Sequence, residues 1–328
     1  MSIKIRTIEL ANPIVVAPMA GVTDESFRVM LRQFNPGLIY TEMVSDKAIV
    51  YRNQRTLDMM HIEPEEHPIT LQVFGHDIDS MVEAAVYIDQ NTDCDIIDVN
   101  MGCPVSKVVK NQAGSALMQD PEHIGKMMEA LVKAVSKPVS AKIRAGWDQS
   151  SINAVEVARI LEASGVELVA VHGRTRSQMY QGSADLEIIR AVKQAVSIPV
   201  LGNGDIDSVE SAHHMMDYTG CDGVMIGRAT LKNPWLIKQL VDDYNHQLSD
   251  RVVTMTDKLN WLDRHCRLSI NHLGEDMAMR HMRSHALWLV SGLPKSAELK
   301  RLLTEMKSYG EFVRIIEEYK ERVENYES

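Results

Sequence analysis

Short apolar runs rich in β-branched residues alternate along the chain with longer segments whose apolar residues recur at helical spacing. The apolar runs have the length of strands, and hydrophobicity without strict alternation is typical of a parallel sheet whose outer face is covered. These runs occupy residues 13–21, 37–45, 68–75, 94–102, 138–146, 167–175, 199–206 and 222–229. Amphipathic segments such as 80–90, 121–135 and 152–165 lie between most of them and predict helices.

Eight such strand–helix units are what a closed (β/α)8 barrel, the TIM barrel, requires. A doubly wound open sheet is the competing α/β fold. That fold ordinarily carries a GxGxxG turn after its first strand, whereas the turn here reads APMAGVTDESF and lacks the pattern. The sequence therefore favours the barrel.

The strand pattern stops near residue 254, and helical segments follow at 257–274, 275–294 and 296–326. We therefore predict a barrel domain over residues 1–245 and a small C-terminal α-helical domain over residues 246–328.

Cysteine usage and hydropathy exclude several classes of protein. The four cysteines form no CxxC pair, so neither a zinc site nor a disulfide framework is expected, and we predict no metal. No apolar run reaches about 18 residues, and the first residues lack the features of a signal peptide. We expect a cytoplasmic protein with no membrane partner and no obligate protein partner.

The net charge of −10 argues at first against nucleic acid as a partner. Residues 254–328, however, balance 12 Lys and Arg against 12 Asp and Glu, so the whole excess lies upstream. Within residues 264–307 the count is 8 against 4, with four histidines added. This segment is either a local basic face or an ordinary mixed-charge helical surface.

Each predicted strand ends in residues that are polar or that suit ligand contact, and catalytic groups of α/β barrels gather at such ends. In chain order they are Pro18, Met19, Ala20, Glu42, Gln72, Asn100, Cys103, Lys142, Arg144, His172, Arg174, Asn203, Gly204, Asp205, Gly227 and Arg228. One polar residue at a strand end means little, but their occurrence at successive ends indicates a functional site.

The last two strand ends have the character of a phosphate site. They read GNGD at 202–205 and IGR at 226–228, and the loops after strands seven and eight are the usual phosphate site of this barrel. Glycine lets backbone amides approach a ligand closely, and Arg228 can donate two parallel hydrogen bonds to phosphate oxygens.

Lys142 and His172 lie on strands that otherwise look buried. A buried lysine needs an anion or a strongly lowered pKa, so Lys142 is either a Schiff-base amine or a charge held against an anionic cofactor. A single histidine is more often a satisfied core residue, but His172 is followed by Gly-Arg at a strand end.

Taken together, the motifs resemble those of the tRNA-dihydrouridine synthases, and most closely the bacterial DusB-like branch. The segments that carry the resemblance are APMAGVTD, DVNMGCPVSKVVKNQAGSALM, KIRAGWD, VHGRTRSQMYQGSAD, GNGDI, MIGRATLKNPW and MRSHALWLVSGLP. They occur in this order from about residue 5 to about residue 310.

The resemblance implies an FMN-binding barrel joined to a helical domain that grips tRNA, with NADPH as the electron donor. Pro18, Met19 and Ala20 would line the flavin ring, Gln72 and Lys142 would bond its polar edge, and His172 would lie close to it. The ribityl chain and phosphate would be held by Asn203, Gly204, Asp205, Gly227 and Arg228.

Cys103 matches the catalytic acid of this family. Reduction of the C5–C6 bond of uracil needs a hydride on one carbon and a proton on the other, and a thiol with a pKa near 8.5 is mostly protonated at neutral pH. Gly102 and Pro104 would shape the turn that presents it. The alternative is a buried structural thiol, as free cysteines often are.

The target base must be turned out of the folded RNA to reach such a site. Asn100 is a candidate anchor for the base, and Arg144, Arg174 and Arg176 are candidates for the uracil edge or nearby phosphates. Arg283 and Lys300 of the helical domain would contact the tRNA backbone.

Three other functions remain open from the residues. A second FMN barrel, acting on a free pyrimidine as dihydroorotate dehydrogenase does, would share the phosphate loops but would not need the basic tail. An aldolase-like barrel would use Lys142 as a Schiff base without flavin. A non-catalytic RNA-binding barrel would not need the thiol of Cys103.

Overall fold

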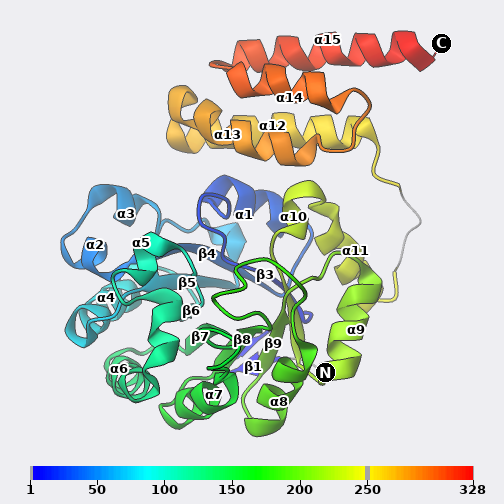
Figure 1. Cartoon of the computed structure of the whole chain (residues 1–328). Helices are drawn as coiled ribbons and strands as arrows, with labels where there is room; N and C mark the ends of the chain where they lie inside the picture. Colours follow the sequence, from blue (N-terminus) through cyan, green and yellow to red (C-terminus); the bar gives the residue numbers. More distant parts are fainter. Residues whose placement is uncertain (1–2, 248–251, 328) are drawn as a thin grey trace.

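The eight strands close into a parallel barrel, as Figure 1 shows for the computed structural model, which describes residues 3–247 and 252–327, with side chains to residue 323. The order around the barrel is β10-β3-β4-β5-β6-β7-β8-β9. The barrel strands are β3 (Ile14–Val16), β4 (Leu38–Ser45), β5 (Ile69–Phe74), β6 (Ile96–Met101), β7 (Val139–Arg144), β8 (Leu168–His172), β9 (Val200–Asn203) and β10 (Gly223–Ile226). The predicted TIM barrel is confirmed, and the open doubly wound sheet is excluded.

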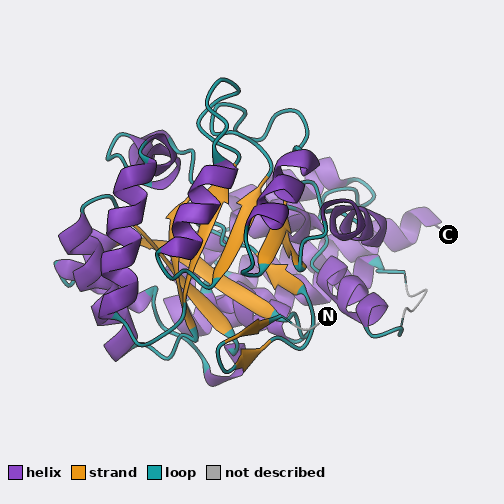
Figure 2. Cartoon of the chain, turned by 90° about the horizontal axis from the view of Figure 1, so that it is seen from below, coloured by secondary structure: helices purple, strands orange, loops and turns teal. Residues whose placement is uncertain are grey.

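Helices cover the outside of the barrel, and Figure 2 shows the strands enclosed by them. The helices of the barrel region are α1 (Glu25–Arg32), α2 (Asp46–Val50), α3 (Gln54–Asp58), α4 (Ile78–Asn91), α5 (Ser106–Val109), α6 (Pro121–Ala134), α7 (Ala154–Ala163), α8 (Leu186–Ala195), α9 (Val209–Thr219), α10 (Ala229–Lys232) and α11 (Trp235–Tyr244), with 3-10 turns η1 (Pro64–Glu66) and η2 (Gly114–Gln119). Their apolar faces and the outer side chains of the strands form one continuous core.

A short hairpin precedes the barrel and was not expected from the pattern. Strands β1 (Lys4–Ile5) and β2 (Ile8–Glu9) pair antiparallel. Ile3, Ile5 and Leu10 are buried in one cluster with side chains from the barrel interior, including Tyr40 and Leu201. The hairpin therefore covers the interior apolar layers, and the polar residues follow at the opposite, carboxyl ends of the strands.

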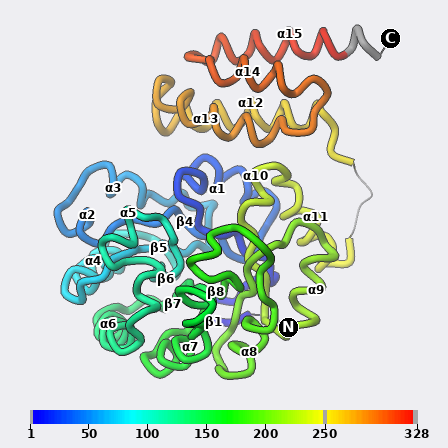
Figure 3. Tube along the Cα trace, viewed as in Figure 1, coloured from blue at the N-terminus to red at the C-terminus, as the bar shows by residue number. Residues whose placement is uncertain are grey.

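The described residues from 252 onward form four helices, which stack on one side of the barrel (Figure 3). They are α12 (Met255–Leu273), α13 (Glu275–Leu289), α14 (Ser296–Glu305) and α15 (Tyr309–Glu327). The helical segment expected over 296–326 is thus divided in two. We propose the division at 245/246 as a domain boundary; residues 248–251 and 328 of the second part lie outside the described residues.

Aromatic side chains join the helical region to the barrel. Trp261 of α12 stacks on Phe34, which follows α1, with ring centroids 5.3 Å apart, and it also contacts Trp235 of α11. Arg264 donates to Gln33 at 2.9 Å across the same contact. The interface is therefore apolar at its centre and polar at its edge. Within the described residues, no helix combines the length and the apolarity needed to cross a lipid bilayer.

Candidate functional site

Strand pairing places the predicted site residues next to one another at one end of the barrel. Asn100 of β6 is in register with Lys142 of β7, Arg144 with His172 of β8, and His172 with Asn203 of β9. In a parallel barrel the carboxyl ends of all strands meet at the same rim. The polar residues found by reading separate strand ends therefore belong to one group.

A chain of hydrogen bonds runs from the barrel interior to the turn that holds Cys103. Asp98 accepts hydrogen bonds from the Ser140 hydroxyl at 2.6 Å and from Gln72 Nε2 at 2.7 Å. Gln72 Oε1 accepts from Asn100 Nδ2 at 2.8 Å, and Asn100 Oδ1 accepts from the Cys103 amide at 2.8 Å. Asn100 thus fixes the backbone at Cys103 in addition to any contact with a ligand.

Asp98 was not identified from the sequence, although a carboxylate inside the apolar run IIDVN is a signal of this kind. It is fully buried, and burial raises its pKa to about 6, while the hydrogen bonds from Ser140 and Gln72 and the charge of Lys142 oppose the shift. Gln72, predicted to contact the flavin edge, is 1% exposed and is a member of this chain of hydrogen bonds. A ligand contact from Gln72 would use its second amide hydrogen or second oxygen lone pair.

The Cys103 turn is held from both sides and leaves the thiol partly exposed. Ser115 donates two hydrogen bonds to the Cys103 carbonyl, at 3.1 Å from its amide and 2.9 Å from its hydroxyl. Gly114 has φ +62°, and a Cβ there would lie 2.8 Å from the same carbonyl, so only glycine lets the next loop pack this closely. Burial raises the pKa of the Cys103 thiol, and the nearby Arg144 and Lys142 charges oppose the rise only in part. The thiol therefore remains protonated at neutral pH.

Cations surround His172. Burial lowers the pKa of His172 far below its usual range, and Lys142, Arg144, Arg174 and Arg228 each lower it further. Burial and the Arg144 charge lower the pKa of Lys142 to about 8, and burial lowers that of Arg144 to about 10. His172 is therefore a neutral imidazole in a strongly electropositive environment.

One carboxylate faces these cations. Asp205 accepts two 2.7 Å hydrogen bonds from Arg174 Nη2, and Arg228 Nη2 lies 3.7 Å away. Burial opposes the ionisation of Asp205, but bonds from the Ala184 amide and Arg174 lower its pKa below the ordinary value. With the buried Asp98 beside Lys142, two carboxylates stand against the four cations around His172, which leaves an excess of positive charge that suits an anionic ligand.

The predicted GNGD loop is shaped by its own packing. Asn203 accepts a hydrogen bond from Lys142 Nζ at 3.0 Å and donates to the Met225 carbonyl at 2.7 Å. Gly204 has φ +122°, and a Cβ there would lie 2.6 Å from Ala184 Cβ. Gly227, by contrast, would accept a Cβ in ordinary contact with its neighbours. The fold requires glycine at 204 and leaves space beside residue 227.

The end of the first barrel strand presents an irregular turn with partly exposed residues. Pro18 and Met19 are half-buried and Ala20 is exposed, so their surfaces are available to a ligand. The Met19 amide donates to the Thr23 hydroxyl at 3.0 Å, and the Gly21 amide donates to Glu42. Burial raises the pKa of Glu42.

Of the arginines predicted to bind substrate, Arg144 and Arg174 already donate hydrogen bonds to the protein, whereas the buried Nε of Arg176 has no hydrogen-bond partner among the described residues. Arg144 donates to the carbonyls of Gly102, Thr175 and Met179 at 2.7, 3.0 and 2.9 Å. These bonds tie the Cys103 turn to the loop after β8. The predicted substrate contact of Arg144 would use its remaining donor capacity.

Two aromatic residues near this rim were not identified from the sequence. Tyr180, 51% exposed, lies under Arg228 at 4.6 Å and near Arg144 at 5.7 Å from its ring centroid. Trp147 lies under Arg176 at 4.5 Å. Trp147 stands in the motif KIRAGWD and Tyr180 in VHGRTRSQMYQGSAD. The ring of Tyr180 is exposed and that of Trp147 is half-buried, and both lie beside cations.

Arg283 and Lys300, predicted to contact RNA, lie on α13 and α14. Two guanidinium nitrogens of Arg283 donate to the Met306 carbonyl at 3.0 and 2.7 Å, where α14 ends. Lys300 Nζ donates to the Ser291 hydroxyl at 3.2 Å. Arg283 therefore holds the end of α14 with two hydrogen bonds, whereas Lys300 makes a single hydrogen bond to a side chain.

The fold and the rim are those of an α/β barrel that carries a group of cations and a thiol at the carboxyl ends of its strands. The family model described as dihydrouridine synthase (Dus) matches residues 15–324. The chain belongs to the dihydrouridine synthase family, and it is an enzyme of the kind that the sequence motifs indicated.

Individual relatives agree with this assignment. The chain is 38% identical over 308 residues to a probable tRNA-dihydrouridine synthase of Rickettsia prowazekii, covering 93% of each chain. It is 37% identical over 314 residues to tRNA-dihydrouridine synthase B of Pseudomonas syringae, covering 93% of this chain and 90% of the relative. The corresponding protein of Pseudomonas aeruginosa is 38% identical over 305 residues. These relatives are consistent with the bacterial DusB-like branch.

Proposed function

We propose that this enzyme reduces uridines in tRNA to 5,6-dihydrouridine, with FMN as its cofactor and NADPH as the electron donor. Relatives named for this activity cover nearly the whole chain, barrel and helical region alike. The observation that carries the proposal is the Cys103 turn, held by Asn100 and Ser115 beside a group of cations that outnumbers the nearby carboxylates.

The residues at the rim fit FMN, which carries a phosphate at one end and a flat ring at the other. Arg228 and the backbone at Asn203, Gly204 and Gly227 would hold the anionic end of FMN, and Lys142 would bond the polar edge of its ring. The cations at this rim outnumber the carboxylates Asp98 and Asp205. His172 is neutral and would lie against the flavin. When bound, reduced FMN supplies a hydride to one carbon of the uracil C5–C6 bond.

The remaining ring-lining assignments rest on the resemblance to the family. Pro18, Met19 and Ala20 would contact the flavin ring with their partly exposed surfaces, and Gln72 would bond its polar edge while keeping its contact to Asp98. Asp205 would accept hydrogen bonds from the ribityl hydroxyls of FMN. Its carboxylate oxygens are acceptors and would repel the phosphate.

Cys103 would deliver the proton to the other carbon of the C5–C6 bond. Its thiol is protonated because burial raises its pKa, and its backbone is fixed by Asn100 and Ser115. A rigid mount and a proton available at the operating pH are what general acid catalysis needs. Asn100, also a candidate anchor for the base, would align thiol and substrate together.

RNA binding would draw on both parts of the chain. Arg144, Arg174 and Arg176 lie at the rim, with Trp147 and Tyr180 offering surfaces on which an extruded base can stack. The helical region would add phosphate contacts, with Lys300 as the clearest candidate and Arg283 as one already engaged with Met306.

The rival functions are separated by simple measurements. A free-pyrimidine dehydrogenase is not favoured by the family, and turnover of orotate or uracil without RNA would support it. An aldolase-like role for Lys142, whose lowered pKa suits a Schiff base, requires colourless protein and borohydride trapping of a carbonyl substrate on that lysine.

The test uses purified full-length protein. We expect a flavin absorption spectrum, bleaching on addition of NADPH, and dihydrouridine formation in tRNA from cells that lack the enzyme. Cys103→Ala should keep the flavin and NADPH bleaching but lose dihydrouridine formation by at least about 100-fold. Cys221→Ala, which removes a buried barrel thiol, is the matched control and should remain active. Protein without flavin, or full activity in Cys103→Ala, would refute the proposal.

A further inference from the structure

Three imidazoles and one carboxylate meet where the barrel contacts the helical region. Asp24 caps the N-terminus of α1, accepting from the Phe27 amide at 2.9 Å. His265 lies on α12, and His281 and His285 lie on α13. This group is separate from the residues assigned to the flavin and uracil, and nothing in the proposed reaction uses it.

The geometry of three members is that of a ligand set. His281 and His285 are four residues apart on one helix, the spacing that places two imidazoles on the same face. One ligand atom each from Asp24, His281 and His285 lie within 4.8 Å of one another. His281 Nδ1 and Asp24 Oδ2 are 3.1 Å apart. Because Asp24 comes from the barrel, the set bridges the two parts of the molecule.

Buried nitrogen atoms in this group have no partner in the protein. The Nε2 atoms of His265 and His285 are buried and make no hydrogen bond within the described part of the chain, and these residues are only 1% and 5% exposed. Their rings lie 4.7 Å apart, and both pack on Phe27. A buried polar atom without a partner costs stability and points to an ion or water that completes the group.

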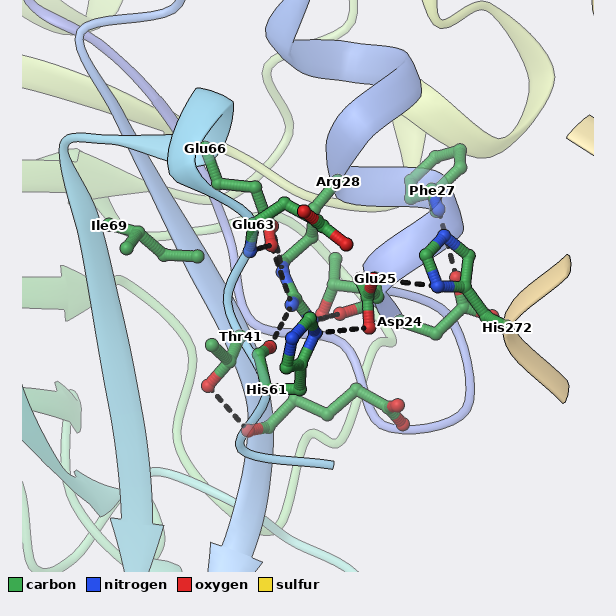
Figure 4. Close-up of polar contacts among 12 residues, drawn as sticks. Asp24, Glu25, Phe27, Arg28, Thr41, His61, Glu63, Glu66, Ile69 and His272 are labelled. Atoms are coloured by element: carbon green, nitrogen blue, oxygen red, sulfur yellow. Dashed lines mark hydrogen bonds and ion pairs between the residues drawn. The ribbon is translucent and has the colours of Figure 1, made fainter. Parts of the chain in front are cut away.

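A second cluster nearby shows the contrast. Glu25 lies between His61 and His272, with Nδ1 atoms 3.0 and 2.7 Å from its two oxygens (Figure 4). Each imidazole there already faces a carboxylate oxygen. Two imidazoles there share the two oxygens of one carboxylate, whereas Asp24 lies among three imidazoles and, within the described residues, is in hydrogen-bond contact with only one of them, His281.

We propose that Asp24, His281 and His285 bind one divalent transition-metal cation, with zinc as the best fit, and that this ion joins the helical region to the barrel. Two imidazoles and one carboxylate are a ligand set that zinc accepts, with a fourth position left for water or for His265. Zinc ligands lie about 2.0–2.2 Å from the ion, so the three side chains must close by small rotations.

The chemistry of the donor groups agrees with this assignment. Two imidazoles and one carboxylate offer nitrogen and oxygen donors that a divalent ion accepts, and the Asp24 carboxylate supplies a negative charge. Metal binding would displace the hydrogen bond between His281 and Asp24.

The first experiment measures metal directly. Full-length protein produced without a histidine tag is stripped with a chelator, equilibrated with Zn²⁺, dialysed and assayed for metal and protein. We expect one zinc per chain, and a Co²⁺-substituted sample should show the visible bands of low-symmetry four-coordinate cobalt. Protein that retains no zinc and no such bands overturns the proposal, and ordered water then completes the imidazoles.

The second experiment assigns the ligands. Asp24→Asn keeps a good helix cap for the Phe27 amide but removes the anionic ligand, so it should remain folded. We expect Asp24→Asn and His281→Gln each to weaken Zn²⁺ binding by at least about 100-fold. His213→Gln, which removes an exposed histidine paired with Asp243 on the barrel, is the control and should bind zinc as the unaltered chain does. Equal binding by all four proteins would place the metal elsewhere and overturn the assignment.

Discussion

Asp98 determines the direction of the hydrogen bonds that end at Cys103. An ionised carboxylate only accepts, so Gln72 must turn its NH2 group toward Asp98 and its oxygen toward Asn100. Asn100 then donates to Gln72 and is left with its oxygen facing the Cys103 amide. Each amide in the chain is therefore oriented by the group beneath it, and the first orienting group is a carboxylate in the barrel interior.

Replacement of Asp98 by Asn should therefore disturb a residue that it does not touch. The new NH2 group can face the Ser140 hydroxyl or Gln72. If it faces Gln72, the side-chain amides of Gln72 and Asn100 are expected to reverse. The Cys103 amide then loses its acceptor, Asn100 Oδ1. We expect kcat for tRNA reduction to fall roughly 10- to 100-fold, with flavin content retained. Ser140→Ala is the control, because it removes the other bond to Asp98 and leaves the Gln72 orientation intact. Equal losses in both variants would contradict the orienting role.

The pH dependence of proton transfer follows from the thiol of Cys103. Its pKa is raised, so the acid form is present at and below neutral pH and is lost only as the pH rises through that pKa. The rate of single-turnover tRNA reduction by pre-reduced enzyme should therefore be constant through neutral pH and fall in alkaline solution. The rate of flavin reduction by NADPH should not show this alkaline decrease. A fall that begins below pH of about 7 would show that another group supplies the proton.

The sequence identified which residues gather at the rim but not which partner each would have. The polarity of strand ends is visible in the chain, since carboxyl ends of parallel strands meet. Asn100 was predicted as a base anchor, yet one of its contacts is the Cys103 amide. Arg144 was predicted for substrate, yet it joins two loops through Gly102 and Thr175. Such partners depend on side-chain directions that only the closed barrel sets.

At the scale of elements, a buried ion pair fixes α1 to the segment before β5. Arg28 and Glu66 are 1% and 0% exposed, and Glu66 accepts from Arg28 Nε at 2.6 Å (Figure 4). Arg28 also donates to the carbonyls of Thr23 and His61, and Glu66 accepts from the Glu63 amide. Every charged atom of the pair is thus engaged, which is the condition under which a buried pair is tolerated.

Glu66→Gln should leave the Arg28 charge buried and unpaired. We expect the free energy of unfolding to fall by roughly 3–5 kcal/mol, measured by urea denaturation of the full chain. Glu65→Gln changes the exposed neighbour in the same turn and should alter stability by less than about 0.5 kcal/mol. Similar values for the two variants would mean that solvent reaches Arg28 when its partner is removed.

The elements that the sequence predicted well are those with long apolar patterns. The barrel strands followed from continuous apolar runs, but the hairpin β1–β2 has strands of two residues, too short for any period to appear. The segment 296–326 keeps a helical pattern throughout, yet α14 ends at Glu305 and Arg283 binds the Met306 carbonyl. A contact from another helix, absent from the local pattern, stabilises that break.

At the scale of the whole molecule, charge is divided between the two parts of the chain. The net charge of −10 belongs to the region before residue 254, because residues 254–328 carry 12 positive and 12 negative side chains. The net charge of the region before residue 254 opposes RNA, whereas that of residues 254–328 is balanced. If the chain binds tRNA as proposed, we expect the cations at the rim and those of residues 264–307 to hold its phosphates.

Variants of Lys300 and Arg283 can distinguish a contact with RNA from a contact that stabilises the helical region. Lys300 donates only to the Ser291 hydroxyl among the described residues, so Lys300→Ala should leave the melting temperature within about 2 °C. It should weaken tRNA binding and lower the slope of log K against log salt by about 1, the value for one lost phosphate contact. Arg283→Ala also removes the bonds to Met306 and should lower the melting temperature as well. Binding isotherms at several salt concentrations, with melting curves of the same samples, give both quantities. An unchanged slope in Lys300→Ala would remove Lys300 from the proposed RNA contacts.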